Sequence, residues 1–237
     1  MMEVLPSVQS QPLFAVSLTV AAYAAAEMLW QTTGKPALLN PVLVATALVA
    51  AVLVGLDIAY QEYLLQAQPI DEALALLIVL LAVPLCRQFG LIRTSGPALV
   101  AALFIGSAVA LATAVVLPVV VGAGDDLVAT IAPKSATTAV AVEVAERLGG
   151  VSGLTAVIVI STGIFGAAFG PSILELGGVR DERAKGFALG VASHAIGTAR
   201  AFQISETAGA FASVGMILNA LLTMALVPLV FALVAPG

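Results

Sequence analysis

Cationic and hydroxyl side chains gather in two short stretches of an otherwise apolar chain. The first runs Pro133-Lys-Ser-Ala-Thr-Thr and carries Lys134, Ser135, Thr137 and Thr138. A lysine at the centre of a bilayer is energetically expensive unless it is paired or lies in a watery cavity. We therefore expect this stretch to line a buried cavity. The alternatives are a lysine that extends to the membrane surface, and hydroxyls that bond helix carbonyls or hold helices together.

The second stretch contains four polar residues, Ser193, His194, Thr198 and Arg200. A guanidinium binds a carboxylate through two parallel hydrogen bonds, which makes Arg200 a candidate anion-binding residue. His194 can titrate near neutral pH, so His194 and Glu143 are candidates for coupling ligand movement to a proton. The alternatives are a purely structural histidine, and an ion pair between Arg200 and either Glu206 or Glu143.

Prolines and glycines interrupt the apolar runs around both stretches. The residues expected to break helices are Pro41, Pro133, Gly163, Gly170, Pro171, Gly190 and Gly197. Lipid cannot satisfy the backbone groups that a break frees, so such segments must lie inside protein or line a cavity. Broken helices near the membrane midplane typically build the substrate sites of secondary transporters, where helix N-termini attract anions. Asn40, which precedes Pro41, is expected to contribute to the same site.

The composition predicts the elements that position these residues. Hydrophobic residues make up 61% of the 237-residue chain, charged residues only 10%, and the mean hydropathy is +1.11. Apolar stretches of about 17–25 residues, the length that crosses a bilayer as a helix, separate the charged clusters. We expect an all-α polytopic membrane protein with about six to eight transmembrane helices and two broken or re-entrant segments. The predicted spans are 13–30, 41–59, 73–86, 97–121, 151–172 and 207–234.

These elements are expected to form one integral membrane domain over residues 1–237, multi-pass in the inner membrane. Faint internal similarity suggests two repeat halves, about 36–122 and 127–234, which would be inverted if each has an odd number of crossings. An acidic loop at 57–72 and a basic loop at 87–93 place the basic one in the cytoplasm. The basic 180–185 loop is cytoplasmic only if 128–148 is re-entrant, whereas a complete inverted repeat requires that segment to cross.

Several classes of function are excluded or disfavoured by the residues present. Cys86 is the only cysteine and His194 the only histidine, so neither a disulfide nor a metal site built from these residues is expected. Hydrolase and nucleotide-binding motifs are absent, and we expect neither an enzyme nor a cofactor. The formal charge of −5 and the lack of a basic surface argue against nucleic acid as a partner.

At these positions the chain resembles the LrgB/CidB family, which includes bacterial YohK-type proteins and the plastidic glycolate/glycerate translocator of plants. The resemblance covers about residues 36–230. The matching segments are Asn40-Pro41, Pro84-Leu85, Pro133-Lys-Ser-Ala-Thr-Thr, Glu143, Gly149-Gly150, Leu154-Thr-Ala-Val, Thr162-Gly-Ile, Gly170-Pro171, Ser193-His-Ala-Ile-Gly-Thr-Ala-Arg-Ala201, Gly209-Ala210 and Pro228. Two departures are Ala139-Val140, where the family usually has Pro-Ile, and Gln203, where an acid is frequent.

The resemblance implies transport of small monocarboxylates such as glycolate, glycerate, pyruvate or lactate. We expect a secondary transporter that works by alternating access and forms a homodimer. Coupling of transport to protons is one form of this expectation. The expected substrate-binding residues are Asn40, Lys134, Ser135, Thr137, Thr138, Ser193, His194, Thr198 and Arg200. The resemblance also implies an alternative, an antiholin-like regulator of murein hydrolases and lysis that acts with a small LrgA/CidA-type membrane partner.

Overall fold

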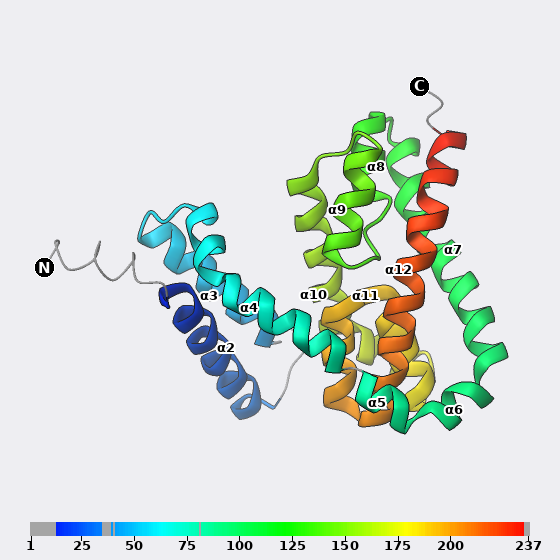
Figure 1. Cartoon of the computed structure of the whole chain (residues 1–237), viewed down its shortest axis with the longest axis horizontal. Coiled ribbons are helices and arrows are strands. Elements are labelled where there is room, and N and C mark those ends of the chain that lie inside the picture. Colours follow the sequence, from blue (N-terminus) through cyan, green and yellow to red (C-terminus); the bar gives the residue numbers. More distant parts are fainter. Residues whose placement is uncertain (1–12, 35–38, 40, 81, 235–237) are drawn as a thin grey trace, which may run out of the picture. The chain divides into compact units, whose positions relative to one another are not determined.

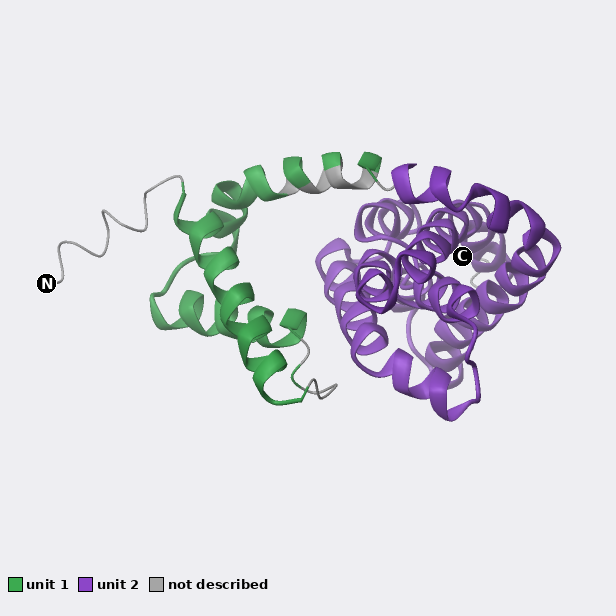
Figure 2. Ribbon diagram, turned by 90° about the horizontal axis from the view of Figure 1, so that it is seen from below, with its two compact units in different colours: residues 1–80 green, residues 81–237 purple. Residues whose placement is uncertain are grey.

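The computed structural model describes residues 13–34, 39, 41–80 and 82–234, so Asn40 lies outside the described residues. Every regular element in these ranges is a helix, α2 to α12 (Figure 1). The prediction of an all-α protein is confirmed. The described chain forms two compact units, residues 1–80 and residues 81–237 (Figure 2). The single domain and the repeat halves remain predictions.

The first unit contains α2 (Phe14–Thr32), α3 (Pro41–Gly55) and α4 (Tyr60–Leu80). Small residues let α2 and α3 pack closely, through Ala22, Ala26 and Ala45. The Thr19 hydroxyl of α2 is hydrogen-bonded to the Tyr63 hydroxyl of α4 at 2.7 Å.

The start of α4 at Tyr60 corrects the expected acidic loop at 57–72. Its first residues are mainly Gln, Glu, Leu and Ala, which are good helix formers, so the acidic side chains are carried on a helix. The turn is confined to the residues before α4, where Asp57 has a φ of 53°. The predicted span 73–86 is accordingly divided between α4 and the short helix that follows.

The second unit contains α5 (Ala82–Arg87), α6 (Phe89–Thr94), α7 (Gly96–Val120), α8 (Asp125–Ile131), α9 (Thr138–Arg147), α10 (Ser152–Leu176), α11 (Glu182–Ile204) and α12 (Glu206–Val234). In the described ranges, three helices are long and apolar enough to cross a membrane: α7, α10 and α12. They correspond to the predicted spans 97–121, 151–172 and 207–234. The expected total of six to eight crossings stays a prediction.

Helices α11 and α12 approach each other more closely than ordinary side chains allow. A Cβ on Gly186 would collide with the backbone of Ala208, and one on Gly190 would collide with the backbone of Ala212. In each helix the two small residues are four positions apart and so lie on one face, the arrangement that lets helices in membranes pack backbone against backbone. These four positions fix α11 against α12.

Helices α8 and α9 fold back on each other. Val128 of α8 packs with Val144 of α9 in one core cluster. Beyond α9, the backbone N–H of Val151 donates to the Thr130 hydroxyl at 2.8 Å, and Gly150 packs against the Thr130 backbone. Segment 128–148 therefore ends beside the place where it begins. The structure favours a re-entrant segment over a full crossing.

This re-entrant course brings the two basic segments to one end of the second unit. One core cluster joins the start of α7 to the start of α11. There Arg183 Nη1 donates to the Ser95 hydroxyl at 3.5 Å. Segments 87–93 and 180–185 thus lie on the same side, as the charge pattern requires when both are cytoplasmic. Of the two expected topologies, the structure favours the one in which segment 128–148 is re-entrant.

Candidate functional site

The break in α11 lies at His194, between the two glycines that were expected to cause it. His194 has φ 43° and ψ −132°, while Gly190 and Gly197 are helical. A positive φ at a non-glycine residue is costly and persists only where the surroundings hold it. The imidazole Nε2 is 3.0 Å from the carbonyl oxygen of Val159, and the Thr198 hydroxyl donates to the His194 carbonyl at 2.8 Å. The side chain and the carbonyl of His194 are both held.

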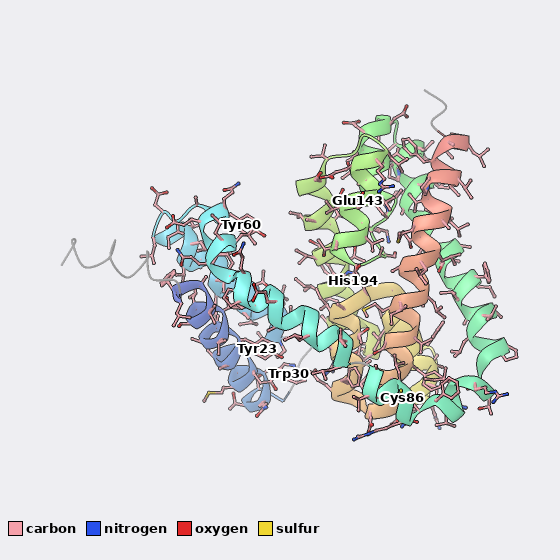
Figure 3. All side chains as sticks on the ribbon, viewed as in Figure 1. Tyr23, Trp30, Tyr60, Cys86, Glu143 and His194 are labelled. Atoms are coloured by element: carbon pink, nitrogen blue, oxygen red, sulfur yellow. The ribbon has the colours of Figure 1, made fainter. Side chains whose placement is uncertain are left out.

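The break turns the second half of α11 back along the first. A Cβ on Gly197 would collide with the Leu189 carbonyl oxygen, although eight residues of straight helix would separate these positions by about 12 Å. Ala201 of the second half also packs with Leu189 of the first, in a cluster completed by α12. Figure 3 shows the labelled His194 near mid-height of the second unit. The α11 break is therefore enclosed by protein.

The predicted breaks at Gly163, Gly170 and Pro171 are wrong, because α10 is a continuous helix through all three. The glycines serve close packing instead. A Cβ on Gly163 would lie 2.6 Å from the His194 ring, and one on Gly170 would lie 2.7 Å from the Leu189 side chain. The face of α10 toward α11 is thus hollowed to accept the broken segment.

The first break lies where the sequence predicts it. α8 ends at Ile131, Pro133 is in the turn that follows, and α9 begins at Thr138 after the N-cap residue Thr137. Lys134 is half-buried in this turn. Within the described ranges its ammonium makes neither a hydrogen bond nor an ion pair. A half-buried cation of this kind is suited to bind an anionic ligand. Pro41, by contrast, is the first residue of α3.

The two breaks meet at Val159 of α10. Its carbonyl bonds the His194 ring, and its side chain packs against Ala136 of the first break and Ala141 of α9. Two helices begin here, α9 and the second half of α11. The first N–H groups of a helix have no partner inside it, and they carry the positive end of its dipole. The neighbourhood of Val159 is consequently suited to an anion.

A second connection between the breaks runs through Asn219 of α12, which is 1% exposed. Its Nδ2 donates to the Ser135 carbonyl at 2.8 Å and to the Val191 carbonyl at 3.2 Å. Its Oδ1 accepts from the Ser107 hydroxyl of α7 at 2.6 Å. One amide therefore satisfies backbone next to both breaks and ties them to α7 and α12.

Ser193 supplies a hydroxyl that is poised for a ligand. It is 1% exposed, and its Oγ has no hydrogen-bond partner within the described residues. A buried hydroxyl without a partner costs free energy, so such a group commonly marks a functional place. Ser193 also lines a groove of about 490 Å³ between α10 and α11. Gly166 of α10 leaves room for it, since a Cβ there would collide with Ser193 Oγ.

The remaining predicted residues are placed as follows. Ser135 is buried in the first break, Thr138 is half-buried at the start of α9, and Thr198 is buried in the second half of α11. Arg200 is half-buried on that same half-helix, and its Nη1 donates to the Gln203 side chain at 2.9 Å. It lies two turns beyond the break.

Glu143 and Glu206, the alternative partners of Arg200, are engaged with other arginines. Glu143 is bound by Arg147 at 2.6 Å and is exposed on α9, and Glu206 is 3.4 Å from Arg87. The labelled Glu143 lies apart from His194 in Figure 3. The structure does not bring Glu143 to the breaks.

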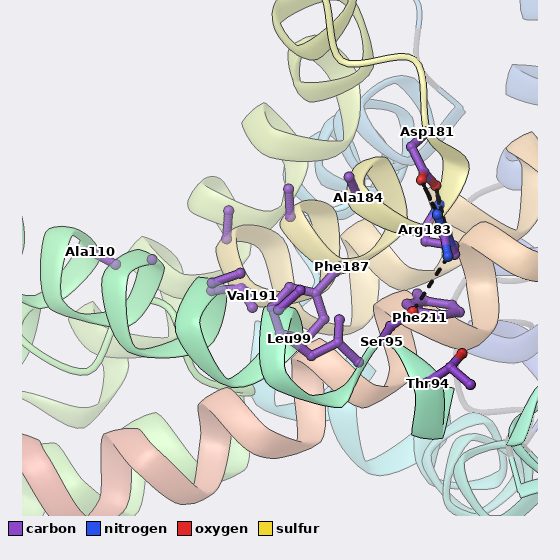
Figure 4. A pocket seen from close by; sticks show the side chains of 15 residues that line it. Thr94, Ser95, Leu99, Ala110, Asp181, Arg183, Ala184, Phe187, Val191 and Phe211 are labelled. Carbon is purple, nitrogen blue, oxygen red and sulfur yellow. Dashed lines mark hydrogen bonds and ion pairs between the residues drawn. The ribbon is translucent and has the colours of Figure 1, made fainter. Parts of the chain in front are cut away.

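A larger groove of about 640 Å³ runs between α7 and α11 (Figure 4). At one end, Arg183 Nε donates to both carboxylate oxygens of Asp181, at 3.0 and 3.1 Å. These hydrogen bonds lower the pKa of Asp181 to about 2, so the pair stays ionised near neutral pH. The groove is lined mainly by apolar side chains, and its lining in the described ranges includes none of the predicted site residues.

Sequence reasoning missed Asn219, Ser107 and Val159. Asn219 had a usable signal, because a lone amide inside the apolar run 207–234 is itself an expensive intramembrane polar group. Ser107 is one of many hydroxyls in apolar segments and had no distinguishing feature. Val159 contributes through its backbone carbonyl, which no residue type reveals.

Comparison with known proteins places the chain among membrane proteins. The model of the LrgB-like family matches residues 19–233. An uncharacterised protein of Haemophilus influenzae is 34% identical over 200 residues, which cover 84% of this chain and 87% of that protein. No solved structure matches the chain significantly.

Two staphylococcal relatives carry a functional name. Holin-like protein CidB of Staphylococcus aureus is 34% identical, and that of Staphylococcus epidermidis is 31% identical. Each match spans 223 residues, 94% of this chain and 97% of the relative. These names fit the predicted lysis-related alternative better than the predicted transporter, and they mention no substrate.

Replacing Asn219 tests whether one amide holds the two breaks together. Asn219→Leu leaves the Ser135 and Val191 carbonyls without a donor, and each buried unsatisfied group costs about 1–3 kcal/mol. We expect the unfolding temperature of the purified protein in detergent to fall by roughly 5 °C or more. The control is Thr113→Val, which removes an exposed hydroxyl that bonds only its own helix. Equal unfolding temperatures for the two variants would contradict the assignment.

Proposed function

The chain belongs to the LrgB-like family, and on this premise we propose that it is a secondary transporter of small monocarboxylates that works by alternating access. The observation that carries the proposal is the break of α11 at the buried His194, which meets the break before α9 at Val159. Irregular backbone at membrane depth is tolerated where it is enclosed, and paired broken segments are the usual construction of transporter sites.

The chemistry of the breaks supports a carboxylate as the ligand. The two helix N-termini near Val159 present N–H groups to an anion, and Lys134 supplies a half-buried positive charge in the first break. Arg200 is the second candidate for holding the carboxylate. A 2-hydroxy or 2-oxo oxygen on the neighbouring carbon would then bond the Ser193 hydroxyl, which has no partner among the described residues. Small acids such as glycolate, glycerate, pyruvate and lactate carry both of these groups, a carboxylate and an oxygen on the neighbouring carbon.

Alternating access would move the broken segments relative to the helices that cover them. The hollowed face of α10 provides a surface for such a movement, in which α11 and α12, held together by their close contact, would move as one. We propose that the protein works in the inner membrane as a homodimer, each copy with its own site. Its partners would then be the substrate and the bilayer.

One second candidate is a holin-like function in which the protein controls murein hydrolase activity and lysis with a small LrgA/CidA-type partner. The names of the staphylococcal relatives favour it over transport. No described side chain points to this activity. It differs from the transporter in a measurable way, because a regulator or pore former needs no saturable carboxylate site.

Uptake into liposomes distinguishes the two candidates. We expect purified protein to take up radiolabelled glycolate or pyruvate saturably and to exchange it in counterflow. Ser193→Ala should weaken apparent affinity by roughly 2- to 10-fold, since a hydrogen bond between neutral groups contributes about 0.5–1.5 kcal/mol. Lys134→Gln and Arg200→Ala identify the cation that holds the carboxylate, because one of them should abolish uptake.

The matched control is Arg93→Ala, an exposed arginine on α6 that should leave uptake unchanged. Non-saturating leakage of solutes would indicate a pore and support the holin-like candidate. Reconstituted protein that moves no monocarboxylate would also count against the transporter. Both results would favour the lysis-related function with a small membrane partner.

Proton coupling through His194 is a separate part of the proposal. If His194 carries the coupled proton, His194→Gln should lose uptake driven by an inward proton gradient. Counterflow needs no gradient, so the same variant should retain exchange of labelled for unlabelled substrate. Full gradient-driven uptake by His194→Gln would show that the imidazole serves only to hold the break through Val159.

A further inference from the structure

A small cavity lies between α7, the first break and α12. The space open to the centre of a water-sized sphere is about 10 Å³, close to the minimum that admits one water molecule or an ion of similar size. Four of its nine lining residues are polar, namely Ser107, Ser135, Asn219 and Thr223, and the other five are aliphatic. All four are buried, with exposures between 1% and 9%.

The hydrogen bonds around this cavity leave oxygen lone pairs rather than N–H groups to face an occupant. Both N–H groups of the Asn219 amide are used, toward the Ser135 and Val191 carbonyls. The Ser107 hydroxyl proton is also used, toward Asn219 Oδ1. Asn219 Oδ1, Ser107 Oγ and the Ser135 carbonyl oxygen each keep a lone pair. The hydroxyls of Ser135 and Thr223 make no hydrogen bond within the described ranges.

The backbone at the end of α8 also borders the cavity. Ala132, the C-cap residue of α8, also lines the cavity. At this end the carbonyls of Thr130 and Ile131 already accept hydrogen bonds, from the Thr155 hydroxyl at 3.1 Å and from the Lys134 N–H at 3.0 Å, so the side-chain oxygens carry the site. No charged side chain of the described residues lines the cavity, and Lys134, which is in the neighbouring turn, does not line it either.

We propose that this cavity binds a single dehydrated Na⁺ ion. The ligands would be the oxygens of Ser107, Ser135, Asn219 and Thr223. An all-neutral oxygen set suits a monovalent ion, whereas Ca²⁺ and Mg²⁺ sites are normally built with carboxylates. Because Asn219 joins the cavity to both breaks, an ion here would stabilise the arrangement in which the carboxylate site is formed. This coupling role rests on the proposed function, while ion binding itself does not.

The test is the thermal stability of the purified full chain in detergent. Unfolding is followed in NaCl, KCl and choline chloride at constant ionic strength, without any carboxylate. We expect the unfolding temperature to rise saturably with Na⁺ by several degrees, because a ligand that binds only the folded state stabilises it. K⁺ and choline should produce no such rise. Thr223→Val, which removes one oxygen at constant volume, should weaken the Na⁺ response at least tenfold in concentration.

Thr113→Val, the same substitution on an exposed face of α7, is the control and should respond like the unmodified protein. Ser107→Ala is a second variant that removes a different oxygen from the cavity. Equal stability in all three salts would overturn the proposal and leave a water molecule as the occupant. An equal response to K⁺, or an unchanged Na⁺ response in both variants, would also overturn it. Carboxylate uptake without Na⁺ dependence would remove the coupling role alone.

Discussion

The close contact between α11 and α12 is the constraint on which the second unit depends. Glycines 186 and 190 lie against the backbone at Ala208 and Ala212, and any larger side chain at either glycine would force the helices apart. The contact fixes the first half of α11, and the cluster of Leu189, Ala201 and Ala208 then holds the second half back against it. The break at His194 is the point at which this folding back occurs.

Satisfaction of the freed backbone is the second requirement, since lipid offers no hydrogen bonds. His194 meets it with its ring and its carbonyl, and Asn219 meets it for carbonyls beside both breaks. Among the side chains at the break, the buried Ser193 hydroxyl has no partner in the described residues. We regard this hydroxyl as the clearest sign that the enclosed breaks receive a polar ligand.

The sequence predicts the helical class, the long spans and the first break, because hydrophobic length and Pro133 act locally. It places the second break within 193–200 but assigns it to Gly190 and Gly197, whereas the residue that adopts the positive φ is His194. Gly163, Gly170 and Gly190 leave room for neighbouring helices, and Gly197 leaves room for the first half of its own helix, a role that appears only when the partner segment is in place. The hub at Asn219 depends on carbonyls from distant segments, and no residue type announces it.

Direct binding of a carboxylate by the purified protein tests the central claim, that the meeting point of the two breaks is an anion site. In equilibrium dialysis with radiolabelled glycolate or pyruvate, we predict saturable binding of one anion per chain. Ser193→Ala should weaken it and Arg93→Ala should not. Absence of binding for every small monocarboxylate, or binding that Ser193→Ala leaves unchanged, would contradict the account.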